Sequence, residues 1–305
     1  MSNRIRLDLL TPEDGYSQLN RKENVFEVYT PHVLIQIIGY IKYAYKDGPV
    51  LFRGQGKNYP QMKPGLFRDI KNITPVSSRI DSTYKYIDQL YKKKAFLTNT
   101  PAIAYEPLLQ HYGIKTTWLD LVDNIWTALW FASHSAKVAG PSGKYVHYEI
   151  NNGIYSYISI LYFGKMLNTK SSHTEEKIKL IFDRYNQQYS PESTSQPWFI
   201  ETDTYRIIDL RYATPSLYKR PHAQHGLLAQ RTRFSSDSDI DYSDAKVCTL
   251  KIATKSVLEW LGNGSLSSTH FMFPPPKYDS GYEKFLTRGI DPPSPMLGSI
   301  QIIGA

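Results

Sequence analysis

The chain has 305 residues, of which 41% are hydrophobic, and its 36 Lys and Arg residues against 28 Asp and Glu residues give a formal net charge of +8. This length is enough to bury a full hydrophobic core, in one large domain or in one domain with a smaller appendage. The single cysteine, Cys248, excludes an intrachain disulfide and any zinc site built from several cysteines, and we predict no metal site.

The most apolar segments are too short or too interrupted for a targeting or membrane role. Residues 1–14 mix charged residues with leucines and hold no apolar run of the length of a signal peptide. Residues 154–163 are interrupted by Ser156 and Ser159 and could not cross a bilayer. We therefore expect a cytoplasmic protein without membrane contact. Its positive charge would attract polyanions such as nucleic acid, although many basic proteins bind none.

The first predicted elements are a helix and a buried strand. Thr30 can cap the helix with its hydroxyl, Pro31 suits the first turn, and apolar residues follow at helical spacing. A turn at residues 47–49 then leads into an apolar strand at residues 50–52. A second helix is expected from about Ser82.

Two more helices precede a strand-rich second half. The first ends at residues 108–113, where Gly113 can adopt the left-handed conformation that closes a helix. Asp123 can cap the next helix, which we expect to stop near Gly140. The later predicted elements are strands at residues 153–163, 205–210 and 247–252, and a helix around residues 175–185. Helices first and strands later indicate an α+β fold.

The predicted first strand ends in Arg53, Gly54 and Gln55. An arginine at the end of a buried strand presents a permanently charged fork that can give two parallel hydrogen bonds to a phosphate or a carboxylate. Gly54 would let a ligand or another backbone segment approach closely. Two interpretations stay open: Arg53 binds an anionic ligand, or it pairs with an internal carboxylate.

Five short motifs follow one another in an order typical of one known family. They are residues 52–55 (FRGQ), 110–113 (QHYG), 117–120 (TWLD), 128–132 (ALWFA) and 220–228 (RPHAQHGLL). Together they resemble the successive motifs of the FRG domain family, which is named for its Phe-Arg-Gly signature. The resemblance covers roughly residues 30–260. It leaves residues 1–29 as an N-terminal extension and residues 261–305 as a C-terminal segment that we expect to pack on the same domain.

One segment departs from the family pattern. Members often end near a Phe-Pro-Asp-Leu-Asp-Gly stretch, and residues 273–281 keep little of it. No role therefore follows for the acidic residue of this segment, Asp279.

A second resemblance concerns the segment Phe52-Arg53-Gly54. It is similar to the first-strand arginine motif of ADP-ribosyltransferases, in which such an arginine holds a phosphate or a ribose of NAD. The resemblance implies an ADP-ribosyltransferase-like fold, with a helix-rich N-terminal half packed on a mainly antiparallel split sheet. It also implies NAD as the substrate.

This second resemblance implies roles for several polar residues. Arg53 would clamp the diphosphate of NAD next to Gly54, and Gln55 would hydrogen-bond a ribose or an amide. His111 would orient a ribose hydroxyl or act as a general base, because its charge changes near neutral pH. Gln224 lies where such transferases usually carry a catalytic glutamate. An amide there can form hydrogen bonds but cannot act as a base.

The proposed chemistry requires these groups to share one site. We predict Arg53, His111 and Gln224 as the catalytic residues and expect them to meet in a single cleft. Because Gln224 is an amide, a carboxylate such as Glu149 or Glu201 could serve the ribose instead. A pocket that binds a nucleotide without turning it over is equally compatible with this sequence.

Thr117, Asp120 and Arg220 complete the predicted cofactor-binding set. Each of the first two also has a structural alternative, since Asp120 could cap a helix start and Thr117 could hydrogen-bond the backbone. His111, in turn, could be a buried histidine whose partner is Asp120.

Two polar stretches bear on possible partners. Residues 211–233 alternate basic and aromatic side chains, a pattern that suits nucleic acid because bases stack on such rings. Residues 237–244 carry four aspartates among serines and are predicted to form an exposed polar loop. Cys248, within a predicted strand, is expected to be a small buried side chain.

Two functions follow from these observations. The first is an NAD-dependent ADP-ribosyltransferase, acting as a bacterial toxin or phage-defence effector on a nucleic-acid acceptor (RNA or DNA), with an antitoxin or other protein as a possible partner. The alternative is a non-catalytic FRG module that binds a nucleotide, nucleic acid or partner protein.

Overall fold

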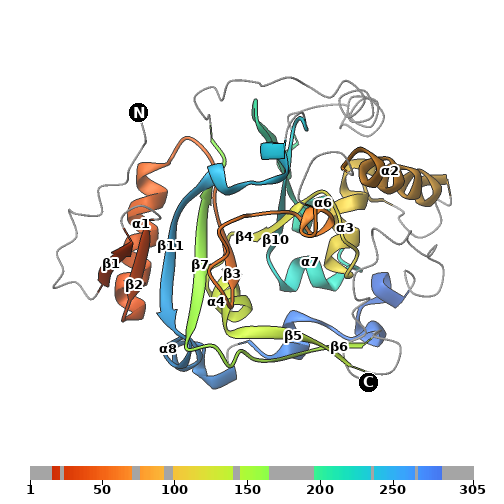
Figure 1. The fold of residues 1–305 in the computed structure, drawn as a ribbon. Helices are drawn as coiled ribbons and strands as arrows, with labels where there is room; N and C mark the ends of the chain where they lie inside the picture. The colour runs from red at the N-terminus through yellow and green to blue at the C-terminus, as the bar shows by residue number, and fades with distance from the viewer. Residues whose placement is uncertain are drawn as a thin grey trace.

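A computed structural model describes residues 16–20, 24–70, 76–92, 99–139, 145–164, 196–234, 237–264 and 267–283 of the protein (Figure 1). Its helices are α1 (Pro31–Ala44), α2 (Val76–Lys92), α3 (Tyr105–His111), α4 (Ile125–Ser133), α6 (Leu210–Ala213), α7 (Lys219–Ala223), α8 (Thr254–Trp260) and α9 (Thr269–Met272). Its strands are β1 (Tyr16–Asn20), β2 (Val25–Val28), β3 (Val50–Gln55), β4 (Leu119–Val122), β5 (His134–Ala139), β6 (Tyr145–Ile150), β7 (Tyr155–Tyr162), β8 (Phe199–Glu201), β9 (Tyr205–Asp209), β10 (Gly226–Arg231) and β11 (Lys246–Ala253).

The centre of the fold is a large mixed sheet. Nine strands are hydrogen-bonded in the order β1-β2-β11-β7-β3-β4-β10-β9-β8. The β2–β11 pair is parallel, and the other neighbours in this sheet run antiparallel. Strands β5 and β6 form a separate two-stranded sheet. The fold is therefore α+β, as the order of the predicted elements indicated.

The shortest backbone pairing in the large sheet is the one between β3 and β4. Strand β3 pairs with β7 along its whole length, from Val50 to Gln55. With β4 it shares a single residue pair, Phe52 with Val122, after which the two strands separate. The sheet that we expected to be split is thus continuous in its hydrogen bonding, and one residue pair joins its two halves.

The two faces of the sheet pack against different parts of the chain. Phe52 and Val122 point to the face on which buried residues of α1 and α4 pack, and with them they form the largest buried cluster of the described residues. Because side chains alternate along a strand, Leu51 and Leu121 point to the opposite face. There they pack with Met62 in a second cluster.

Helix α1 begins as predicted. The Thr30 hydroxyl accepts a hydrogen bond from the backbone N–H of Val33 at 3.2 Å, and Pro31 occupies the first helical position. Gly113, just after α3, has a φ of 90°, which confirms its left-handed conformation. Helix α2 begins at Val76, six residues earlier than Ser82.

The start and the end of α4 differ from the prediction. Asn124, not Asp123, caps this helix, and its side chain accepts from the backbone N–H of Trp126 at 2.9 Å. The Asp123 carboxylate instead binds Arg211 at 2.6 Å. The helix ends at Ser133 rather than near Gly140, because the chain from residue 134 becomes β5 and pairs with β6.

Strand β10 was not anticipated, and one predicted helix cannot be compared with the structure. Strand β10 lies within the large sheet and is fully buried. It carries the polar residues Gln230 and Arg231, so its sequence does not show the apolar pattern of a buried strand. The helix predicted around residues 175–185 lies outside the described residues. The other three predicted strands are confirmed as β7, β9 and β11, and Cys248 in β11 is buried as expected.

The described part of the C-terminal segment packs on the body of the protein. Met272 and Phe273 belong to the largest buried cluster, and Tyr282 stacks on Tyr112 with ring centroids 4.8 Å apart. None of the helices within the described ranges is long and apolar enough to cross a membrane.

Helix α4 lies directly against Gly54, so a side chain at this position should destabilise the protein. A Cβ at this position would lie 1.8 Å from the carbonyl oxygen of Ala128, a backbone atom that cannot move aside. We expect Gly54→Ala to lower the free energy of unfolding by about 3 kcal/mol, measured by urea denaturation.

The matched control for this substitution is Gly39→Ala in the exposed middle of α1, where nothing lies within 4 Å of the added Cβ. It should raise the free energy of unfolding by up to about 1 kcal/mol, because alanine favours the helix. A Gly54→Ala variant as stable as the wild type would contradict the packing described here.

Candidate anion-binding site

Arg53 lies where β3 and β4 separate. Its guanidinium Nη1 donates a hydrogen bond to the backbone carbonyl oxygen of Asp120 in β4. The side chain is half-buried, and by alternation along β3 it belongs to the same face of the sheet as Leu51 and Met62. Arg53 therefore bridges the two halves of the sheet beyond their last backbone pair.

The charge of Arg53 is only partly compensated. Burial and the neighbouring positive charge of Arg68 lower the pKa of Arg53 to about 10, while the Asp120 carboxylate and Tyr59 act in the opposite direction. The arginine remains cationic at neutral pH. The positive charges of Arg53 and Arg68 repel each other, and a bound anion would reduce this repulsion.

A cavity of about 320 Å³ opens beside Arg53. Its lining residues are Arg53, Gln55, Tyr59, Pro60, Gln61, Met62, Lys63 and Arg68. Three of these side chains are cationic, and none of the described residues that line the cavity carries a carboxylate. The Lys63 ammonium donates to the carbonyl of Ile70 at 3.0 Å, so its charge is held near the cavity by a neutral partner.

The loop that forms the cavity wall is held by a distant segment. The backbone N–H of Met62 donates to the Asp241 carboxylate at 2.8 Å, and its carbonyl accepts from the N–H of Tyr242 at 3.0 Å. The hydroxyl of Ser243 donates to the carbonyl of Pro60 at 3.1 Å. These bonds fix the backbone on both sides of Gln61.

The same contacts correct the prediction for residues 237–244. We expected an exposed polar loop, but Asp241 anchors the cavity wall and Asp244 binds the buried Arg231 at 2.8 Å. Asp244 also accepts from the hydroxyl of Tyr205 at 2.6 Å. Both carboxylates are thus structural parts of the fold.

His111 and Gln224 form a buried pair under the other face of the sheet. His111 Nδ1 lies 2.9 Å from the side-chain oxygen of Gln224, whose amide nitrogen donates to the carbonyl of Met272 at 2.8 Å. Gly226 allows this arrangement, because a Cβ there would lie 2.3 Å from the His111 ring. Gln224 therefore fixes the orientation of the imidazole.

The second nitrogen of His111 faces Asp120. His111 Nε2 is buried without a hydrogen-bond partner among the described residues, and it lies 3.9 Å from the Asp120 carboxylate. The Asp120 side chain is 42% exposed, and the residue belongs to β4 rather than capping a helix. A water molecule or a substrate hydroxyl could bridge the two groups.

Arg53, His111 and Gln224 therefore do not line one cavity. By alternation along β4, Asp120 lies on the same face as Val122, with its carboxylate 3.9 Å from His111 Nε2, whereas the cavity beside Arg53 is lined by Met62, which packs on the opposite face. Asp120 links the two sets, because its carbonyl binds Arg53 and its carboxylate faces His111.

Two members of the predicted cofactor-binding set lie in the interior. Thr117 donates its backbone N–H and its hydroxyl to the Glu106 carboxylate, at 2.8 and 2.7 Å, and accepts from Gln230 at 2.6 Å. Its hydroxyl thus bonds side chains rather than the backbone. Arg220 is fully buried over the ring of Tyr282, 4.1 Å from its centroid.

Sequence reasoning missed two buried carboxylates. Besides Thr117, Glu106 accepts from the indole N–H of Trp118 at 3.1 Å. Asp279 accepts from the Tyr112 hydroxyl at 2.9 Å and from the N–H of Tyr282 at 3.0 Å. For Asp279 the sequence offered no signal, because its segment departs from the family pattern.

The two alternative carboxylates lie elsewhere. Glu149 is exposed and pairs with His147 at 2.7 Å, and Glu201 pairs with Arg206 at 2.6 Å. Neither lines the cavity beside Arg53. Glu201 belongs instead to a second, larger cavity.

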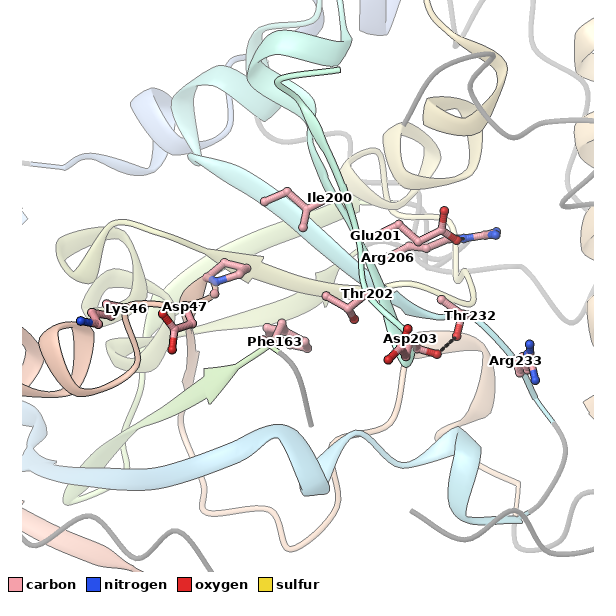
Figure 2. A pocket seen from close by; sticks show the side chains of 13 residues that line it. Lys46, Asp47, Phe163, Ile200, Glu201, Thr202, Asp203, Arg206, Thr232 and Arg233 are labelled. Atoms are coloured by element: carbon pink, nitrogen blue, oxygen red, sulfur yellow. Dashed lines mark hydrogen bonds and ion pairs between the residues drawn. The ribbon is translucent and has the colours of Figure 1, made fainter. Parts of the chain in front are cut away.

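This second cavity has a volume of about 1160 Å³ and is drawn in Figure 2. Its wall carries both signs of charge, with Lys46, Arg206 and Arg233 as well as carboxylates of Asp47 and Glu201. The mixture of charges gives no preference for an anion.

The basic and aromatic residues of 211–233 do not form one surface. Arg211 binds the carboxylates of Asp123 and Asp209, each at 2.6 Å. Arg220 and Arg231 are buried. Tyr212 remains 71% exposed, with the guanidinium of Arg211 5.8 Å from its ring centroid. The expected nucleic-acid contact stays a prediction, with little support from this segment.

Burial of His111 should make the stability of the protein depend on pH. Burial lowers its pKa, an effect that Asp120 and Gln224 partly offset, so the imidazole is neutral at pH 7. The unfolded chain takes up a proton at this residue below about pH 6.5 and the folded protein does so only at lower pH. Stability is therefore greatest above this pH and should fall as the pH drops.

Urea denaturation at pH 7.5 and 5.5 measures this effect. His111→Gln should show a smaller loss of stability between the two pH values than the wild type. Some loss should remain, because burial also lowers the pKa of His134. His147→Gln, at an exposed site, is the control. An unchanged pH dependence in His111→Gln would contradict the neutral buried imidazole.

Comparison with known proteins supports the FRG resemblance over a range that includes the first four of the five motifs. The sequence model of the FRG domain family matches residues 48–139, a shorter range than the predicted 30–260. No curated protein and no solved structure matched the chain. The matched range includes β3 with Arg53, the His111 segment, and α4. The chain therefore contains an FRG domain.

Proposed function

We propose that this protein binds NAD through the cavity beside Arg53 and transfers ADP-ribose from it to an acceptor. One observation carries the proposal: Arg53, Lys63 and Arg68 line a cavity to which no carboxylate of the described segments contributes. A diphosphate would compensate these charges, and a guanidinium can bind phosphate oxygens through two parallel hydrogen bonds.

The reaction would break the bond between C1′ of the ribose and the nicotinamide nitrogen. The electron pair of this bond leaves with nicotinamide, which becomes neutral, and positive charge develops on the ribose. The ribose would extend past the point where β3 and β4 separate to the Asp120 carboxylate, which faces His111, is 42% exposed and could stabilise that charge. The acceptor then attacks C1′ and loses its proton to Asp120 or to water.

His111 and Gln224 would act on the reaction through Asp120. The neutral imidazole can accept a proton or a hydrogen bond at Nε2, the atom that faces the Asp120 carboxylate. Gln224 holds the other ring nitrogen at 2.9 Å and is a positioning residue, since it is buried.

A non-catalytic FRG module is the second candidate. Two features favour it: His111 Nε2 is buried, and an amide occupies the position where transferases usually carry a glutamate. In that case the cavity would bind a nucleotide, and a partner protein would recognise the nucleotide-bound state. An RNA or DNA acceptor, an antitoxin partner, and a role as a toxin or phage-defence effector remain predictions of the sequence.

NAD binding is tested by replacing Arg68 rather than Arg53, because loss of Arg53 would also remove its hydrogen bond to β4 and could unfold the protein. Arg68 is exposed and its Nε lies 3.5 Å from the carbonyl of Lys63, so its loss should leave the fold intact. Removing one charge-assisted contact should weaken NAD binding about tenfold to a hundredfold in calorimetric titration.

The matched control is Arg233→Ala, an exposed arginine at the second cavity, which should bind NAD as the wild type does. Equal dissociation constants for the wild type, Arg68→Ala and Arg233→Ala would mean that NAD binds elsewhere. An absence of binding by the wild type would overturn the proposal.

Asp120→Asn separates chemistry from binding. The bond from Arg53 uses the backbone carbonyl of residue 120, so an asparagine keeps that bridge and removes only the carboxylate charge. We expect nicotinamide release to fall about 100-fold, with NAD affinity and melting temperature near those of the wild type. If the wild type binds NAD but releases no nicotinamide with protein, RNA or DNA acceptors, the non-catalytic module is the correct function.

A further inference from the structure

We infer that the cavity beside Arg53 contains a nucleoside subsite, in which Tyr59 stacks on the base of the bound nucleotide. The inference rests on the proposed function for the site, and it deepens that proposal by naming the residue that contacts the base. The ligand is a nucleoside phosphate, held by the arginines at its phosphates and by Tyr59 at its base.

Tyr59 is placed to form such a contact. It lines the cavity, yet its side chain is 47% exposed, so one part of the ring faces the opening. It also lies close enough to Arg53 to affect the pKa of the guanidinium. An exposed aromatic ring next to a phosphate-binding arginine is the arrangement with which proteins hold nucleotides, because every base offers a face for stacking.

Two amide side chains add hydrogen-bonding groups to the same cavity. Gln55 is the last residue of β3 and Gln61 lies in the loop before Met62, and both line the cavity. A carboxamide both donates and accepts, so it can bind a base edge or the hydroxyls of a ribose. A site for inorganic phosphate alone would need neither the ring nor the amides.

The wall that carries Tyr59 and Gln61 is held in place before a ligand arrives. The Asp241 carboxylate accepts from the N–H of Met62 at 2.8 Å, and Ser243 donates to the carbonyl of Pro60 at 3.1 Å. The Met62 side chain is itself buried in the core. A preorganised wall loses little entropy on binding, which favours a specific ligand.

The size of the cavity limits what it can enclose. At about 320 Å³ it lies at the lower end of the range for small-molecule pockets, about 300–1,000 Å³. It would therefore enclose one nucleotide unit. The remainder of a dinucleotide such as NAD would lie outside, toward the gap between β3 and β4.

Calorimetric titration with ADP and with inorganic pyrophosphate tests the subsite, because the two ligands share the diphosphate and differ in the nucleoside. The wild type should bind ADP more tightly than pyrophosphate. Tyr59→Ala should weaken ADP binding about tenfold, as loss of one stacking contact predicts, and leave pyrophosphate binding unchanged. Tyr59→Phe, which keeps the ring, should restore ADP affinity.

Tyr43→Ala is the control, since Tyr43 is 78% exposed on α1 and does not line the cavity. It should bind both ligands as the wild type does. If Tyr59→Ala loses ADP and pyrophosphate equally, or loses neither, the subsite is overturned.

The same titration separates this inference from the proposed function. ADP binding that depends on Tyr59, in a protein that never releases nicotinamide from NAD, would support the subsite and overturn the transferase. A short 5′-phosphorylated RNA is the second arm. Tyr59-dependent binding of that RNA as well as of ADP would support the subsite and extend it to the end of a nucleic acid. Binding of pyrophosphate without preference for either nucleotide would overturn the subsite while leaving the anion site intact.

Discussion

The hydrogen bond from the Arg53 guanidinium to the carbonyl of Asp120 spans the weakest point of the sheet. Backbone pairing between β3 and β4 is limited to Phe52 and Val122, and Arg53 connects the strands beyond it. The neighbouring residues complete the junction. Phe52 packs into the core, and Gly54 leaves room for the backbone of α4. Each residue of the Phe-Arg-Gly segment thus has a distinct physical task.

This junction also explains how one arginine can serve both the fold and a ligand. Its direct partner is a carbonyl oxygen, which accepts a hydrogen bond without neutralising the positive charge. A guanidinium has five N–H donors, so the bridge leaves others for the cavity. The sequence left open whether Arg53 binds an anion or pairs with an internal carboxylate; the structure gives it a backbone carbonyl as partner instead, which is compatible with an anion site. With Arg68 nearby, the same charge becomes the basis of the proposed phosphate site.

The sequence predicted those features that depend on local pattern. The cap and first turn of α1, the strand that ends in Arg53, the left-handed Gly113 and the order of helices and strands all follow from neighbouring residues. The cavity could not be predicted in this way, because its wall is fixed by a bond between Met62 and Asp241, which are 179 residues apart. The sequence also gave no means to assign faces. Alternation in β3 and β4 separates Arg53 from His111, and that result requires the register of the sheet.

The most direct test of the account is a crystal structure of the protein grown with NAD. The account predicts density for a diphosphate between the guanidinium groups of Arg53 and Arg68, with a base against the ring of Tyr59. A diphosphate bound in the larger cavity between Lys46 and Arg233, with the Arg53 cavity empty, would contradict it.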